Sequence, residues 1–229
     1  MNVSAMALTA SVWVIPALIA ITLHEAAHGW AAWKLGDDTA YRMGRVTFNP
    51  FKHIDPIGTV LVPALLLIAS GGQAMFGFAK PVPVDFRNLR QPRRDMVLVA
   101  AAGPGINVAL AVLAAALFHT LPILPEIAQR WIYFNLMNLV AINLILCVFN
   151  MLPILPLDGG RVAVGLLPWP LAVYLARLER FGILIVLGAL FLLPFIGSRL
   201  GVNLDVFPWL VLLPVEYMKI AIYTLVGLI

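Results

Sequence analysis

Six apolar segments, most of them long enough or nearly long enough to cross a lipid bilayer, limit most strongly how this chain can fold. They cover residues 5–33, 57–69, 96–118, 131–150, 181–196 and 207–228. A helical crossing needs about 20 mainly apolar residues. In lipid, a helix also satisfies its own backbone hydrogen bonds, which an open strand cannot do. The sequence therefore predicts an all-α polytopic membrane protein with five to six transmembrane helices.

The composition points the same way. Hydrophobic residues make up 62% of the chain and charged residues 11%, whereas roughly 25% of the residues in a soluble domain are charged. The net charge is +4, but the basic residues lie between apolar segments, so we expect the lipid bilayer and no nucleic acid as a partner. Cys147 is the only cysteine, which excludes an intrachain disulfide and a metal site made of cysteines alone.

The polar stretches after the first apolar segment contain turn and strand signals. Residues 41–48 mix β-branched and aromatic side chains with arginine, which predicts a short membrane-associated β-hairpin. Residues 71–86 contain Pro81 and Pro83, and proline is excluded from a helix interior. We therefore expect extended chain there.

Basic residues flank the segment that begins at Ile57 on both sides. Lys34, Arg42, Arg45 and Lys52 precede it, and Lys80, Arg87, Arg90, Arg93 and Arg94 follow it. Both groups favour the cytoplasmic side, which predicts that residues 57–78 re-enter the membrane and return. A single crossing at Ile57 is the alternative. No Lys or Arg precedes the first apolar segment, so we expect a retained first helix with its N-terminus outside.

A metal-binding pattern lies near the end of the first apolar segment. His24 and His28 are four residues apart, which places both imidazoles on one face of a helix. Glu25 lies between them, where a carboxylate can take a proton from water activated by a metal, as in the H-E-x-x-H motif of metalloproteases. Structural histidines with a buried glutamate are the alternative, but such groups are costly in lipid without a compensating partner.

A catalytic zinc needs a third protein ligand and one open position. Asp158 is one candidate, because it directly follows an apolar segment in FNMLPILPLDGGR, although an aspartate before two glycines is also common in turns. With residues 57–78 re-entrant, Asp158 and His24 lie at the same depth. His53 is the second candidate.

These motifs resemble the site-2 protease family of intramembrane zinc metalloproteases. HEAAH resembles the zinc-binding helix of this family, and NMLPILPLDGGR resembles its second signature. AAGPGIN resembles a third element of the family. The similarity covers residues 11–161. The resemblance implies that Asp158 is the third ligand of one zinc ion per chain and that Glu25 is the catalytic base. It also implies that Asn150, and less directly Asn107, bind substrate.

The same resemblance implies a compact bacterial-type member without PDZ or CBS domain. We expect a single membrane-embedded domain over residues 1–229, with a core at about 5–161 and accessory helices at about 181–228. It would lie in the bacterial cell membrane with its active site toward the cytoplasm. The oligomeric state is left open.

The expected function is regulated intramembrane proteolysis, the hydrolysis of peptide bonds in or near the transmembrane helix of a membrane protein substrate. A substrate helix hides its carbonyl groups in i to i+4 hydrogen bonds, so it must unwind locally. Residues 46–48 and 78–84 are candidate edges to which the unwound strand could add. A metal-binding membrane transporter and a catalytically inactive scaffold are the alternatives.

Overall fold

The computed structural model describes residues 3–69, 77 and 79–229, and the described residues are largely helical with no strand among them. The α-helices are α1 (Val3–Leu35), α2 (Thr39–Arg42), α3 (Val62–Ala69), α4 (Pro92–Leu117), α5 (Glu126–Asn150), α6 (Asp158–Leu166), α7 (Trp169–Arg177), α8 (Glu179–Leu187), α9 (Leu193–Leu200) and α10 (Leu213–Leu225). Short 3-10 helices are η1 (Pro50–Lys52), η3 (Phe86–Asn88) and η4 (Phe118–Ile123). Turns of π-helix are η2 (Pro56–Leu61), η5 (Gly188–Leu192) and η6 (Pro208–Leu212).

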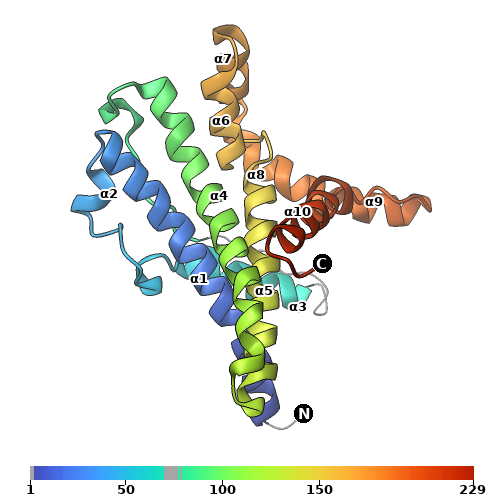
Figure 1. Ribbon diagram of the computed structural model, residues 1–229. Coiled ribbons are helices and arrows are strands. Elements are labelled where there is room, and N and C mark those ends of the chain that lie inside the picture. Colours follow the sequence, from blue (N-terminus) through green and yellow to red (C-terminus); the bar gives the residue numbers. More distant parts are fainter. Residues whose placement is uncertain (1–2, 70–76, 78) are drawn as a thin grey trace.

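Helices α1, α4 and α5 form the central bundle, and α4 packs against α1, α5 and α6 (Figure 1). Near the N-terminal ends of α1 and α5, Trp131 Nε1 donates to Ser11 Oγ at 2.9 Å and Asn138 Nδ2 donates to Val12 O at 2.7 Å. Further along both helices, Asn107 Nδ2 donates to Ala20 O at 3.4 Å and to Asn143 Oδ1 at 2.7 Å, so α1 and α5 run in the same direction (Figure 1). The C-terminal end of α1 and the end of α5 that leads into α6 therefore lie at the same end of the bundle.

Four helical stretches in the described part of the chain are long and apolar enough to cross a membrane: Ala7–Leu35, Pro92–Ile123, Glu126–Asn150 and Glu179–Leu200. The predicted five to six spans are therefore not confirmed. Residues 56–69 are divided between η2 and the short helix α3. The last apolar segment, 207–228, is interrupted by the Glu216–Lys219 ion pair in α10, whose atoms are 2.6 Å apart. In Figure 1, α9 projects away from the central bundle.

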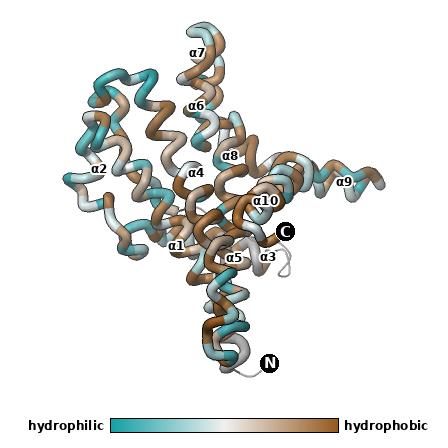
Figure 2. The backbone as a smooth tube through the Cα atoms, viewed as in Figure 1, coloured by the Kyte–Doolittle hydropathy of each residue, from teal (hydrophilic) through white to brown (hydrophobic). Residues whose placement is uncertain are grey.

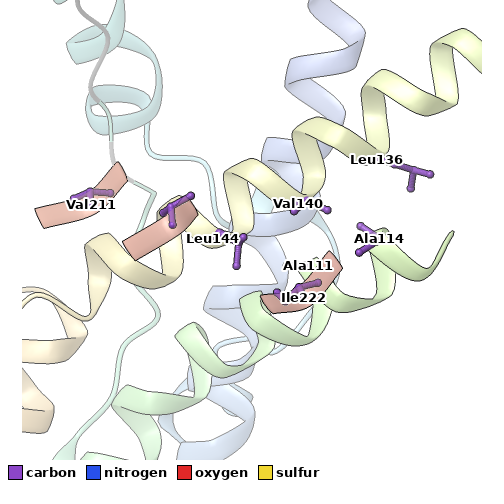
Figure 3. Close-up of a cluster of buried hydrophobic side chains, with 9 residues drawn as sticks. Ala111, Ala114, Leu136, Val140, Leu144, Val211 and Ile222 are labelled. Atoms are coloured by element: carbon purple, nitrogen blue, oxygen red, sulfur yellow. The ribbon is translucent and has the colours of Figure 1, made fainter. Parts of the chain in front are cut away.

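The main hydrophobic core joins α4, α5 and the C-terminal helices (Figure 3). Small residues of α4, Ala111 and Ala114, face Val140 and Leu144 of α5, and Ile222 of α10 packs against the same cluster. Small side chains let helices approach closely in lipid, where packing drives helix association. The core thus fixes α4 against α5, and α4 carries the residues that lie behind the candidate site.

The chain between α1 and α4 leaves and returns at the same end of α1. Arg90 N donates to Leu35 O at 3.0 Å. The buried Asp37 carboxylate accepts Asp85 N at 2.8 Å and Asn88 Nδ2 at 3.1 Å. Figure 2 shows hydrophilic residues gathered at this end. This geometry is what a re-entrant segment requires, although residues 70–76 and 78 of the predicted segment lie outside the described residues.

The predicted β-hairpin over residues 41–48 is not found. These residues form the end of α2, a turn at Gly44 with φ +63° and a series of bends. Arg45 Nη2 donates to Lys80 O at 2.8 Å and to Pro81 O at 3.4 Å. A side chain therefore makes contacts that the backbone of a paired strand would otherwise make. Residues 79–85 are non-helical, as their prolines predict.

Candidate metal centre

Three potential metal ligands converge where α1, α4 and α6 meet. His24 and His28 lie one turn apart on α1, and Asp158 is the first residue of α6. His24 Nε2 lies 3.0 Å from His28 Nε2, and Asp158 Oδ2 lies 3.2 Å from the former and 3.3 Å from the latter. Within the described residues, these three form the one group of His, Cys, Asp or Glu arranged to hold a metal ion. The predicted third ligand therefore lies beside the two histidines.

Hydrogen bonds behind the two imidazoles assign their tautomers. His24 Nδ1 lies 2.6 Å from Asn107 Oδ1, and His28 Nδ1 lies 2.8 Å from Val99 O. Both oxygens accept only, so each Nδ1 carries the proton and each Nε2 presents a lone pair. Asn107 is oriented for this role, because its Nδ2 donates to Asn143 Oδ1 at 2.7 Å. Two lone pairs that face each other at 3.0 Å repel one another unless a proton or a metal ion is shared by the two nitrogen atoms.

The carboxylate completes a set of donor atoms that fits zinc. Asp158 Oδ2 is buried and has no hydrogen-bond donor among the described residues. Nitrogen and oxygen ligands about 2.0–2.2 Å from a tetrahedral zinc lie about 3.3 Å from one another, close to the separations in this cluster. Two imidazoles and one carboxylate also leave one position open, as catalytic zinc sites do.

Gly103 lets α4 approach the imidazoles directly. A Cβ atom at this position would overlap His28 Nε2 and lie 2.6 Å from His24 Cε1. Gly105 lies two residues further along α4. A Cβ atom on Gly105 would have no neighbouring atom within 4 Å. The motif AAGPGIN carried part of the family resemblance, but it did not reveal that Gly103 provides the space for the histidine pair.

Glycines also allow close packing around the loop that presents Asp158. A Cβ on Gly159 would overlap Met151 O, and one on Gly160 would lie 2.5 Å from Leu155 N. On the other side of the loop, a Cβ on Gly182 of α8 would overlap Leu155 O. The backbone of Leu155 is thus enclosed between α6 and α8, which restricts where α6 can begin and where its first side chain lies.

Glu25, the predicted catalytic base, has a defined partner. Its Oε2 accepts the backbone N–H of Val82 at 2.8 Å. Val82 is buried and lies in the non-helical stretch that precedes η3. Sequence reasoning did not anticipate this donor, because a backbone N–H has no residue signature.

The other predicted site residues lie outside the metal-ligand group. Asn107 is fully buried behind His24, so it contacts a ligand histidine and offers no surface to a substrate. Asn150 ends α5, and its Nδ2 donates to Leu146 O at 3.0 Å. His53, the alternative third ligand, places its Nε2 3.1 Å from Thr47 O and is not part of the metal-ligand group.

Comparison with known proteins gives relatives with a shared description. The chain is 37% identical to a Bacillus subtilis protein named "Putative zinc metalloprotease YwhC" over 194 residues, which are 81% of each chain. Over 170 residues, 74% of this chain and 62% of the relative, it is 32% identical to "Putative zinc metalloprotease Rip2" of Mycolicibacterium smegmatis. The Rip2 protein of Mycobacterium tuberculosis is 35% identical over 142 residues, 62% of this chain and 52% of the relative. No family model matches the chain, and no solved structure matches it significantly.

Proposed function

The chain belongs to the site-2 protease family of zinc metalloproteases, and from this membership we propose that it hydrolyses peptide bonds in or near the transmembrane segments of membrane proteins. The observation that carries the proposal is the convergence of His24 Nε2, His28 Nε2 and Asp158 Oδ2, with Glu25 beside them on α1. Four helices that can cross a membrane place this group within a membrane protein.

His24, His28 and Asp158 would hold one zinc ion. When bound, zinc lowers the pKa of water and polarises a carbonyl group. Glu25 then accepts the proton of the attacking water and delivers it to the leaving amine. Its Oε2 accepts the Val82 N–H at 2.8 Å. We assign Asn150 to substrate binding because it lies at the end of α5, just before the loop that presents Asp158.

The substrate must present an extended strand to this site. Of the two predicted edges, the one at residues 78–84 has few backbone N–H and C=O groups free to bind that strand among its described residues, 79–84. Pro81 and Pro83 have no N–H, and the N–H groups of Lys80 and Val82 are bonded to His53 O and Glu25. Lys80 O and Pro81 O accept from Arg45. We therefore propose that residues 46–48, which form bends and not a strand in the free protein, bind the extended substrate chain.

The proposed location is the bacterial cell membrane with the active site toward the cytoplasm, in regulated intramembrane proteolysis. Single cysteines at Asp38 and Asn88, in a Cys147→Ser background, test the orientation with an impermeant thiol reagent in oriented vesicles. Both positions should be labelled from the cytoplasmic face, because Asp37 and Asn88 are bonded to each other. Labelling from opposite faces would exclude the re-entrant arrangement.

Zinc content and cleavage of a single-span substrate by the purified protein test the function. Glu25→Gln should keep zinc and lose about 10²-fold to 10⁴-fold in turnover, because it lacks the base. Asp158→Ala should lose zinc, whereas His53→Gln should retain it. If the parent protein cleaves no membrane-helix substrate, or Glu25→Gln cleaves at the parent rate, the proposal is wrong, and a metal-binding transporter or an inactive scaffold would replace it.

A further inference from the structure

The segment Pro81-Val82-Pro83 offers a single backbone N–H, and Glu25 receives it. Proline has no N–H to donate and keeps φ near −65°, and a residue before proline is restricted to extended conformations. The segment therefore presents one donor from a chain with little conformational freedom. Val82 N lies 2.8 Å from Glu25 Oε2.

Contacts from the loop residues His53 and Arg45 and from Gly29 of α1 fix this segment. On its N-terminal side, Lys80 N donates to His53 O at 2.9 Å. Arg45 Nη2 donates to Lys80 O and Pro81 O, the carbonyl groups that immediately precede Val82. The Val82 side chain faces Gly29, where a Cβ would lie 3.1 Å from Val82 Cγ1. Gly29 is on α1, close in sequence to Glu25, so the Val82 side chain packs against the helix that carries the carboxylate.

Arg45 is unusual among the basic residues because it is 6% exposed and has no carboxylate partner among the described residues. Its Nε is buried without an acceptor in that part of the chain. Burial of a guanidinium without a carboxylate partner is costly. A lysine at this position could replace only part of the planar set of N–H donors that the arginine provides. The role that the structure gives this side chain is to hold two carbonyl groups beside the Val82 N–H.

We propose that Val82 and Arg45 are positioning residues for the catalytic base: Arg45 fixes the Lys80–Pro81 carbonyl groups, and the Val82 N–H then holds one oxygen of Glu25. This inference rests on the proposed function. The Val82 N–H binds Oε2, which leaves Oε1 for the proton taken from water. Without this bond the carboxylate can adopt other rotamers, and a misplaced catalytic group lowers the rate of the chemical step more than the binding of metal or substrate.

Val82→Pro removes the N–H and keeps the extended chain. It should lower kcat on the order of 10-fold to 100-fold, with KM for the single-span substrate and zinc content close to the parent values. Val82→Ala keeps the N–H and trims the side chain, so its kcat should be at least about tenfold above that of Val82→Pro. Val84→Pro is the matched control, because it adds a proline to the same stretch and leaves the Val82–Glu25 bond in place.

Arg45 gives a second, independent test if Val82→Pro does not fold. Arg45→Gln should lower kcat at unchanged zinc content, and Arg45→Lys should recover part of it, because the ammonium can still donate to a carbonyl. Arg42→Gln, at an exposed arginine paired with Asp38, should behave like the parent. Equal kcat for Val82→Pro and the parent, equal losses in Val82→Ala and Val82→Pro, or losses that follow zinc content would each overturn the inference. Because the parent enzyme cleaves its substrate in all these outcomes, they differ from failure of the proposed function.

Discussion

Asn107 Oδ1 lies 2.6 Å from His24 Nδ1, although the two residues are 83 positions apart in the sequence. The contact places the proton on Nδ1 and directs the Nε2 lone pair toward His28 and Asp158. It also explains why a polar side chain is tolerated at a fully buried position of α4, since its oxygen and its Nδ2 both have partners.

We expect Asn107→Leu to weaken zinc binding by about 10-fold to 100-fold, the usual effect of removing a group that orients a histidine ligand. Competition with a zinc chelator measures this directly. Asn138→Leu is the matched control, because Asn138 is also buried but donates to Val12 O at the other end of the bundle. Parent-like zinc affinity in Asn107→Leu would contradict the assigned role.

Gly103→Ala should displace the imidazoles, because the added methyl group would overlap His28 Nε2. Insertion of a methyl group into a packed site typically costs about 1–3 kcal/mol. We therefore expect reduced zinc content and reduced cleavage, read by metal analysis and a substrate assay. Gly105→Ala, with open space at its Cβ position, should stay close to the parent. If the two variants lost zinc and cleavage to the same extent, the loss would come from the change in helix propensity and not from the contact between α4 and the imidazoles.

The histidine pair could be predicted from the sequence, whereas most of its surroundings could not. A spacing of four residues fixes relative position on a helix, so His24, Glu25 and His28 carry their geometry in the sequence. Asp158 needed a topological argument, because it lies on another helix. Val99 O and the Val82 N–H are backbone groups and leave no residue signature. The hairpin prediction failed because residues 41–48 are divided among the end of α2, a turn at Gly44 and bends, which strand propensity alone does not reveal.

Gly182→Ala tests whether the C-terminal helices hold the third ligand. A Cβ on Gly182 would overlap Leu155 O, so the variant must move either α8 or the loop before Asp158. We expect zinc to dissociate faster in a chelator chase, with a loss of stability of about 1–3 kcal/mol. Gly188→Ala, which has nothing within 4 Å of its Cβ position, is the control. Unchanged zinc release in Gly182→Ala would mean that α8 does not restrain the loop.

The Asp37 carboxylate should make stability depend on acidic pH. Burial raises the pKa of Asp37, but hydrogen bonds from Thr39, Asn88 and the Asp85 N–H outweigh it and hold this pKa below its usual value. The stabilisation is therefore complete above the unfolded pKa of about 3.9 and is lost as the pH falls through the folded pKa. Thermal unfolding in detergent between pH 6 and pH 3 would measure this loss.

Asp37→Asn should lower the unfolding temperature at pH 6 and remove part of the acid dependence, because buried hydrogen bonds to a carboxylate are broken at a cost of about 1–3 kcal/mol. The exposed neighbour gives the control, since Asp38→Asn removes only a surface pair with Arg42. An acid dependence in Asp37→Asn equal to that of the parent would show that other carboxylates cause it.

The two parts of the metal centre are made at different times. At roughly 5–20 residues per second, the ribosome adds Asp158 on the order of ten seconds after His28. During that interval α4 is completed, so Gly103, Val99 and Asn107 can already hold both imidazoles, but the third ligand does not yet exist. Helix α8, which encloses Leu155, is made later still. Asp158 and the helix that encloses its loop are therefore the last parts of the metal centre to be synthesised, and we expect a nascent chain released before Gly182 to bind zinc weakly.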